Sequence, residues 1–347
     1  MCGMEAHAVG IHNPDTATRW FDYNASIGVY AASYSTPTAS IGARDLVGSA
    51  PRDGFHLNII SGSLRGRYEA LYGALTLQAG DYARASWVSN TYWLQEAYVG
   101  VHINDDIHLE VGAFSSHLGV ESMILSENYS GIISLPGFFD PNFYGGVKLR
   151  YDVSPTVEIQ ADIVTSFNGF QLEEGVPAFT SGVTWMLDSS ITLFGNVFFS
   201  RETFNQDDQS QIYLNAAATI ELPDIHILGE FNYAAELPDG QLTGQGMVSG
   251  FTGVYYDITS MFTVGARVEF VVDPHGILAG DRFIHDLPFP TFSVGGSTAT
   301  IAYKPLSWIM AKFDVRYLTT LTSESRIETN PDAHKRTEAV LSVDVTL

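Results

Sequence analysis

Apolar and polar residues alternate with a period of two along almost the whole chain, and helical periodicity is nearly absent. Successive side chains of a β-strand point to opposite faces, so this pattern predicts strands with one apolar and one polar face. The pattern recurs in sixteen segments, near residues 20–34, 54–68, 70–84, 93–103, 107–115, 143–153, 156–168, 178–188, 190–201, 210–221, 225–236, 246–257, 261–273, 292–303, 308–319 and 337–347. The chain is therefore predicted to be all-β.

The connections between these segments alternate between short and long. Short ones, such as "NDD" at 104–106 and "SPT" at 154–156, are rich in residues that favour turns. The longest connection spans residues 116–142. Strict short-long order over an even number of strands is typical of an up-and-down barrel, with turns at one rim and loops at the other. A soluble sandwich mixes connection lengths at both ends.

The apolar faces carry no Asp, Glu, Lys or Arg; one of them is formed by Val157, Ile159, Ala161, Ile163 and Phe167. A surface that faces membrane hydrocarbon must lack charged residues, because Lys or Arg at the membrane midplane costs about 2–4 kcal/mol. Aromatic residues lie near strand ends, where an interfacial girdle is expected; they include Phe21, Tyr23, Trp93, Phe143, Tyr151, Phe179, Trp185, Phe262, Tyr303 and Tyr317. These features favour a transmembrane barrel over a soluble β-sandwich.

Two segments depart from the simple pattern. The alternation changes phase around Ile59 and Ile60, which predicts a β-bulge. In residues 246–257 both faces carry apolar side chains, so the pattern does not select an outward face.

Composition and charge narrow the possible partners. The formal net charge of −22 argues against nucleic-acid binding, which needs a basic surface. Cys2 is the only cysteine, so an internal disulfide and a cysteine-based zinc site are excluded. No apolar run approaches the roughly 18 residues of a membrane helix. Because no signal peptide is visible, we expect a processed chain with a periplasmic N-terminal segment, residues 1–19, and a single barrel domain, residues 20–347.

Residues 93–167 resemble the β-barrel porin-2 (OmpL-like) family of bacterial outer-membrane proteins. The resemblance rests on four short elements: Ala97–Val99, Val111–Phe114, Leu118–Gly119 and Asn128–Ser130. It is good for about residues 54–200 and diffuse beyond; the family usually has Lys where Ala113 stands. The resemblance implies an outer-membrane pore of about sixteen strands, with short periplasmic turns and long extracellular loops.

Charged residues on the predicted inner faces are candidates for lining this pore. They are Arg65, Arg67, Arg84, Glu96, Glu110, Lys148, Arg150, Glu158, Asp162, Arg201, Arg267, Glu269, Lys312, Asp314 and Arg316. The loop 116–142 is more apolar than a solvated loop should be, and long loops are usually functional. We expect it to fold into the lumen as a constriction that places Glu121, Glu127 and Asp140 opposite basic wall residues. The alternative is that inward charges form salt bridges without any role in selectivity.

Metal binding and catalysis are weaker interpretations of the same residues. His102, His108, Glu96 and Glu110 share one face of a predicted hairpin, and imidazole and carboxylate suit zinc. Water-facing wall residues explain the pattern equally well, and residues 205–211 ("NQDDQSQ") are better explained as a solvated loop than as a calcium site. His108, Ser115, Ser116 and His117 offer hydrolase side chains, but without a G-x-S-x-G motif.

The sequence therefore predicts a non-enzymatic porin in the bacterial outer membrane, without a cofactor. Its partners would be outer-membrane lipid and the small polar solutes or ions that diffuse through a charged lumen; a homotrimer is compatible with this interpretation. Two alternatives stay open: a plugged barrel that acts as a scaffold for a surface or electron-transfer partner, and a secreted soluble β-sandwich that binds a ligand.

Overall fold

The computed structural model describes residues 19–35, 52–86, 91–122, 124–167, 169–170, 176–204, 207–238, 246–277, 291–325 and 334–347. These residues form sixteen strands: β1 Arg19–Tyr34, β2 Gly54–Tyr68, β3 Leu71–Ala79, β4 Leu94–His102, β5 Ile107–Ser115, β6 Phe143–Ser154, β7 Val157–Val164, β8 Ala178–Met186, β9 Ile191–Phe204, β10 Asp207–Glu221, β11 Ile225–Pro238, β12 Gly246–Thr259, β13 Phe262–Asp273, β14 Phe292–Leu306, β15 Ile309–Thr320 and β16 Lys335–Thr346. The expected N-terminal segment lies outside the described residues, except that Arg19 begins β1.

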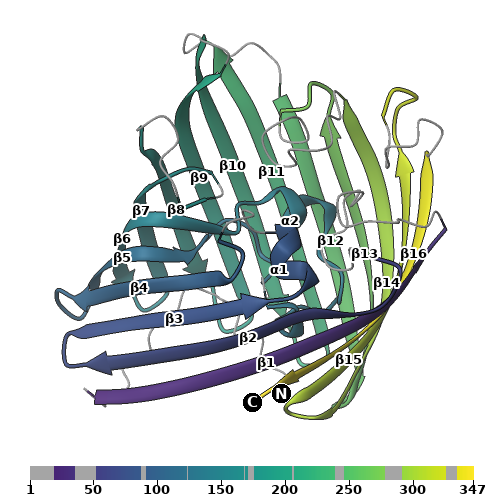
Figure 1. Cartoon of the computed structure of the whole chain (residues 1–347), viewed down its shortest axis with the longest axis horizontal. Coiled ribbons are helices and arrows are strands. Elements are labelled where there is room, and N and C mark those ends of the chain that lie inside the picture. The colour runs from purple at the N-terminus through teal and green to yellow at the C-terminus, as the bar shows by residue number, and fades with distance from the viewer. Residues whose placement is uncertain are drawn as a thin grey trace.

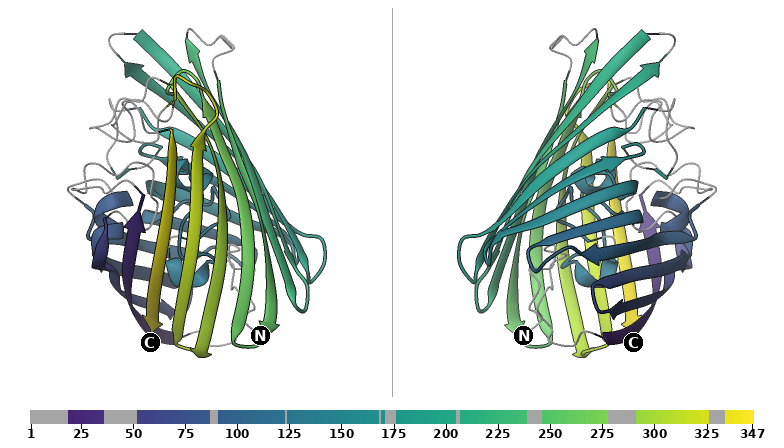
Figure 2. Two further views of the ribbon diagram at one scale, coloured as in Figure 1. Left: turned by 90° about the vertical axis from the view of Figure 1, so that its right-hand side faces the viewer. Right: turned by 90° about the vertical axis from the view of Figure 1, so that its left-hand side faces the viewer.

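Each strand pairs antiparallel with its neighbours in sequence, and β1 pairs with β16 to close the barrel (Figures 1 and 2). Closure leaves no unpaired sheet edge, as a membrane interior requires. Leu347 exchanges two backbone hydrogen bonds with Ala25, so the C-terminus lies beside the early part of β1. This is also the rim of the short connections, because Arg19 pairs with Tyr68 beside the turn after β2. The predicted all-β up-and-down barrel is confirmed.

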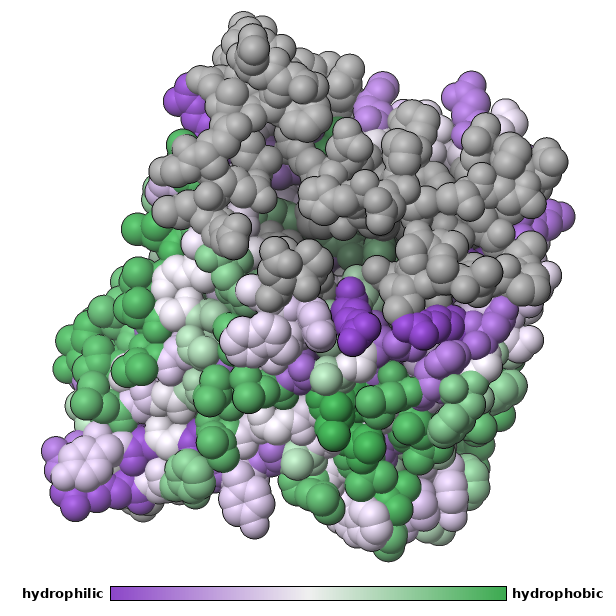
Figure 3. All heavy atoms as spheres, viewed as in Figure 1, coloured by the Kyte–Doolittle hydropathy of each residue, from purple (hydrophilic) through white to green (hydrophobic). Residues whose placement is uncertain are grey.

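Polar residues line the inside of the barrel and apolar residues cover the outside. In β7, Glu158, Gln160 and Asp162 are buried, whereas Ile159 and Ile163 are exposed. Figure 3 shows hydrophobic residues gathered over strands on the viewed face. No helix among the described residues is long and apolar enough to cross a membrane.

Two predicted strands are too long. The strand expected over 70–84 stops at Ala79, and helix α1, Asp81–Ser86, follows it. Gly80 separates them at φ +124°, a conformation that L side chains rarely adopt. The strand expected over 156–168 ends at Val164.

The predicted bulge is present, and the undecided strand has a defined orientation. Gly28 pairs with Ile59 but Val29 pairs with Leu57, which leaves Asn58 as the extra residue of β2. In β12, Val254 and Tyr256 face outward, while Phe251 and Tyr255 are buried inside. Both inner aromatics belong to an apolar cluster that also packs against Val120 and Tyr129 of the 116–142 segment. An inserted segment therefore explains why this strand is apolar on both faces.

The predicted outward position is wrong for two aromatic residues. Phe143 is fully buried and contacts Phe170, and Phe167 is 5% exposed and packs edge-on against Phe198. Alternation continues through the ends of both strands, so it cannot distinguish a girdle position from one turned inward against a folded loop.

Candidate functional site

The segment 116–142 leaves β5 and crosses the inside of the barrel before it enters β6 (Figure 1). It contains a short 3-10 helix, η2, Leu125–Glu127, and helix α2, Leu135–Phe139. Ser134 caps α2 by accepting a hydrogen bond from the Gly137 amide, and Pro136 stands in its first turn. The Asn128 side chain bridges the amide and the carbonyl of Ser122 at 2.7 Å each, which closes the loop around η2.

Apolar side chains of the segment pack on inward-facing apolar residues of several strands. Ile132 joins a buried cluster with Tyr30 of β1 and Val340 of β16. Phe139 packs against Phe292 of β14, with ring centroids 5.7 Å apart. Burial of this kind contributes roughly 25 cal/mol per Å2 of apolar surface, so the segment's apolar character holds it inside the barrel.

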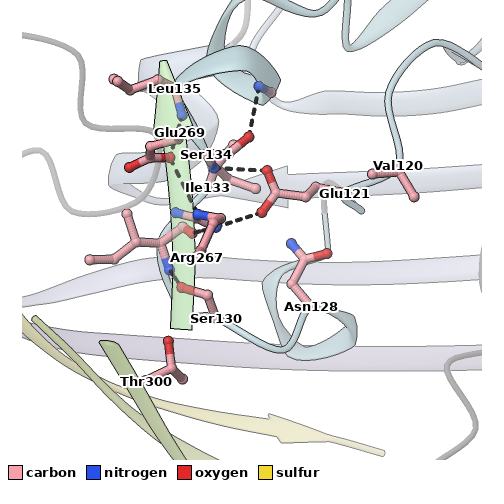
Figure 4. Close-up of polar contacts among 12 residues, drawn as sticks. Val120, Glu121, Asn128, Ser130, Ile133, Ser134, Leu135, Arg267, Glu269 and Thr300 are labelled. Atoms are coloured by element: carbon pink, nitrogen blue, oxygen red, sulfur yellow. Dashed lines mark hydrogen bonds and ion pairs between the residues drawn. The ribbon is translucent and has the colours of Figure 1, made fainter. Parts of the chain in front are cut away.

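Several backbone groups of the segment are bound by charged side chains of the wall. The Leu135 amide donates to Glu269 of β13 at 2.9 Å (Figure 4). The Gly131 amide donates to Asp314 of β15 at 3.0 Å. Arg316 of β15 donates to the Ile133 carbonyl at 3.0 Å. Hydrogen bonds to charged groups contribute about 1.5–3 kcal/mol each. The wall charges therefore act as partners for a chain that has no sheet neighbours.

Lys312 and Glu230 extend this arrangement to the first half of the segment. The Lys312 ammonium donates to the Leu125 carbonyl. The Glu230 carboxylate accepts a hydrogen bond from the Val120 amide at 2.9 Å. The segment is therefore attached along most of its length to strands β11, β13 and β15.

Glu121 joins the segment to the β13 wall. It accepts a hydrogen bond from Arg267 at 2.8 Å through one oxygen and from the Ser134 amide at 2.8 Å through the other (Figure 4). Burial raises the pKa of Glu121 above its ordinary value, and the Arg267 guanidinium opposes that shift. The predicted juxtaposition of Glu121 with a basic wall residue is present in the structure.

Asp140 holds the other end of the segment, but without a basic partner among its described hydrogen bonds. It accepts hydrogen bonds from the Tyr213 hydroxyl and, at 3.1 Å, from the Asn232 amide. Burial raises the pKa of Asp140 well above its ordinary value, and the nearby Glu230 carboxyl raises it further. Glu127 accepts a hydrogen bond from Ser122 within the segment at 2.6 Å.

The wall of β2 to β7 carries its own ion pairs. Glu110 lies 3.0 Å from Arg150 and 3.6 Å from Lys148, and it accepts a hydrogen bond from Tyr72. Glu96 lies 3.1 Å from Arg65. Asp162 lies 3.4 Å from His117 of the segment, and Glu158 is buried on the same inner face. Arg67 lies near the rim and donates to the Glu69 carbonyl.

Two of the expected wall residues lie elsewhere. Arg84 is on α1 with an exposed side chain, and its guanidinium stands 5.3 Å from the centroid of the Tyr92 ring. Arg201 is exposed, whereas its neighbour Ser200 is buried, so Arg201 is on the outer face of β9. Arg84 was misplaced because the strand stops at Ala79. Arg201 was misplaced because the inward and outward positions were exchanged at this end of β9.

Several polar residues on the inner face were missing from the predicted set, and one of them, Asn232, donates to Asp140 of the segment. Arg336 and Glu338 of β16 are buried, 3.1 Å apart, and Glu338 also binds Arg316 at 2.8 Å. Side-chain amides of Asn196, Asn215 and Asn232 form a chain across β9, β10 and β11, with donor–acceptor distances of 2.8 and 2.7 Å. The three asparagines share the inward alternation and would have been identified had uncharged residues been considered. Arg336 precedes the strand expected over 337–347, and Glu338 lies within it.

The side chains considered for metal binding and catalysis have other partners. His102 and His108 contact each other at 2.6 Å, and His108 lies 3.3 Å from Asp152. Within the described ranges, no group of three or more His, Cys, Asp or Glu residues is placed to hold a metal ion. Ser116 donates to Tyr144 at 3.2 Å, while His117 contacts Gln160 and Thr180. The side chains of residues 205–209 in the considered calcium segment lie outside the described part.

Solved structures with a similar fold are outer-membrane channels. The outer-membrane channel DcaP of Acinetobacter baumannii aligns with a TM-score of 0.60 and 12% identity over 96% of this chain and 99% of that one. An anion-selective porin from Comamonas acidovorans aligns with a TM-score of 0.61 and 9% identity over 95% and 100%. The trimer form of OmpT from Vibrio cholerae aligns with a TM-score of 0.59 and 8% identity, over 95% of this chain and 100% of that one. At these identities the likeness concerns the fold alone.

No curated protein matches the sequence. A family model described as "Putative beta-barrel porin-2, OmpL-like" matches residues 21–347, well beyond the part in which the resemblance was clear from short motifs. The chain therefore belongs to this family and is an outer-membrane porin.

Proposed function

We propose that this porin lets small polar solutes or ions diffuse passively through its lumen, and that the segment 116–142 is the constriction. The observation that supports this most directly is the segment's position across the barrel, bound to charged residues of β11, β13 and β15. Its acidic side chains and the charges of the facing wall would then select among solutes by charge. The remaining wall pairs, such as Glu110 with Arg150, would give the lumen a polar lining.

A second candidate is a barrel whose lumen is plugged by the same segment. It is favoured by the burial of the wall charges, since Arg316 and Glu338 are both 0% exposed and Arg267 is 1% exposed. Such a barrel would serve as a scaffold for a surface or electron-transfer partner and would pass almost no current.

Deletion of residues 122–136 separates the two candidates. The purified wild-type barrel and the deletion variant would be compared by single-channel conductance in planar bilayers. A constriction predicts that the wild type conducts and that the deletion raises conductance; a plug predicts conductance only after deletion. Equal conductance of the two proteins would contradict both.

The control for this experiment is a variant that keeps the segment but alters another loop side chain, Asp105→Asn in the exposed turn after β4. Its conductance should equal that of the wild type. The barrel would assemble as a homotrimer, like the trimer form of OmpT from Vibrio cholerae, and native mass spectrometry in detergent would test this.

A further inference from the structure

A cavity of about 630 Å3 lies between the segment 116–142 and the inner wall of β12 to β16. Ser307 and Trp308 of the connection between β14 and β15 line it, as do Ser260 and Met261 of the connection between β12 and β13. It is therefore at the rim of the short connections, beneath the constriction. Its volume is within the range of about 300–1,000 Å3 that is usual for small-molecule sites.

The roof of this cavity is held in place by ring stacking. Tyr129 of the segment lines the cavity, and its ring stacks on His226 at 4.9 Å and on Tyr255 at 4.7 Å between centroids. Its hydroxyl also donates to Glu221 at 3.0 Å. Because Tyr129 is already held in place, a ligand can bind without first ordering the segment 116–142, which lowers the entropy cost of binding.

Asp344 of β16 is the carboxylate in this cavity that has, in the described part of the chain, an oxygen without a hydrogen-bond donor, although the Lys312 ammonium is near enough to attract it. Its side chain is 4% exposed, and its Oδ2 atom has no hydrogen-bond partner among the described residues. Gly28 of the neighbouring strand gives the carboxylate its space, because a Cβ there would lie 2.3 Å from Asp344 Oδ1. A buried carboxylate without a donor is costly, and a bound cation would relieve that cost.

The other charges around the cavity have described contacts of their own or balance one another. Asp257 accepts a hydrogen bond from Thr263 and contacts His226, and Glu127 accepts one from Ser122. Lys312 donates to the Leu125 carbonyl. Together with Lys304, the lining has three carboxylates and two ammonium groups, an excess of one negative charge.

Apolar and aromatic groups form a further part of the lining, beside neutral polar side chains such as Ser260 and Ser307. Trp308, Met310 and Met261 present an indole and two thioethers to the cavity. Aromatic faces attract organic cations, and thioethers adapt to apolar groups of varied shape. We propose that this cavity binds small organic cations that carry an apolar body, with Asp344 accepting from the cationic head.

This site would hold a solute on the periplasmic side of the constriction, so its role in passage rests on the proposed function. Binding itself can be measured without passage. Folded barrels in an uncharged detergent would be titrated with benzylammonium, benzyl alcohol and benzoate, followed by ligand-observed NMR. Benzylammonium should bind saturably and more tightly than the other two. Tighter binding of benzoate, or absence of saturable binding, would overturn the proposal.

The variant Asp344→Asn should weaken benzylammonium binding about tenfold, because a charge-assisted hydrogen bond is lost. The matched control is Asp152→Asn, which removes a carboxylate of β6 outside this cavity and should leave binding unchanged. Equal affinity of Asp344→Asn and wild type, or equal weakening by both variants, would overturn the proposal.

If Asp344→Asn does not fold, Trp308→Ala carries the test, since Trp308 is 44% exposed at the rim and its loss should be tolerated. It should weaken benzylammonium binding several-fold, and unchanged binding would overturn the site. Planar-bilayer conductance keeps the two proposals distinct: binding without conductance overturns passage alone, and conductance without binding overturns this site alone.

Discussion

At the scale of single residues, many of the inner charges are bound to one another or to the segment that crosses the lumen. Arg316, for example, donates to both Glu338 and the Ile133 carbonyl. Removal of one partner from such a pair leaves an uncompensated buried charge, which typically costs about 3–5 kcal/mol. These residues therefore hold the segment in place as well as line the lumen, and a variant at any of them changes both properties.

Asp140 offers a test without a basic partner, because Tyr213 and Asn232 donate to it and the Glu230 carboxyl is a nearby charged group. Its pKa is raised well above the ordinary value of 3.8. A carboxyl group with a raised pKa binds more protons in the folded protein than in the unfolded one. Its stabilising effect is therefore full below the unfolded pKa and is lost as the pH rises through the folded pKa. Asp140→Asn should remove this part of the pH dependence, because the amide stays neutral.

The measurement is the thermal unfolding midpoint of the detergent-solubilised barrel between about pH 4 and about pH 8. The difference between wild type and Asp140→Asn should shift in favour of the variant as the pH rises. Asp105→Asn, in an exposed turn, should follow the wild type at every pH. A pH profile of Asp140→Asn parallel to that of the wild type would contradict the assignment.

At the scale of elements, alternation predicted the strands well because hydrocarbon outside and polar groups inside impose it on every strand. It failed where a folded segment inside the barrel supplies an apolar surface. Phe251 and Tyr255 made β12 apolar on both sides, and Phe143 and Phe167 were assigned to the wrong face. Alternation also placed the end of β3 too late, since Ala83 and Arg84 of α1 stay in phase with Ala79 and Gln78.

The position of the segment 116–142 can be tested with a disulfide between it and β16. A Cβ added at Gly131 would lie 2.6 Å from Ser342 Oγ and 2.9 Å from Asp314 Oδ2, so cysteines at positions 131 and 342 are close enough to bridge once the Asp314 side chain shifts. With Cys2 replaced by Ser, the variant Gly131→Cys/Ser342→Cys should form the disulfide under oxidation. Its single-channel conductance should equal that of the reduced protein, because a constriction conducts with the segment in this position.

The control pair is Gly62→Cys/Ser342→Cys, since a Cβ at Gly62 would have nothing within 4 Å. It should remain reduced. If oxidation of the first pair closes the channel, the segment must move for current to pass, and it acts as a gate or plug instead.

At the scale of the whole molecule, the sequence predicted the barrel and the presence of an apolar loop, but not which wall the loop contacts. That choice depends on contacts between residues far apart in the chain, such as Gly131 with Asp314 or Glu121 with Arg267. Alternation assigns a residue to a face and carries no information about its partner across the lumen. The inward position of most charged residues was therefore predictable, and their pairing was not.

Ion selectivity is also a property of the whole molecule. The barrel fold alone does not determine it, since one solved barrel of similar architecture is an anion-selective porin, whereas the charge of this chain favours cations. Here the formal net charge is −22, and Arg267 and Arg316 are already bound by carboxylates. The unbalanced field is therefore negative, and we expect the channel to prefer K⁺ over Cl⁻ in a salt gradient across a planar bilayer. The preference should weaken as salt rises from about 0.1 M to about 1 M, because the Debye length falls from about 10 Å to about 3 Å. A reversal potential of the opposite sign would show that the basic wall residues, and not the net charge, control the passing ion.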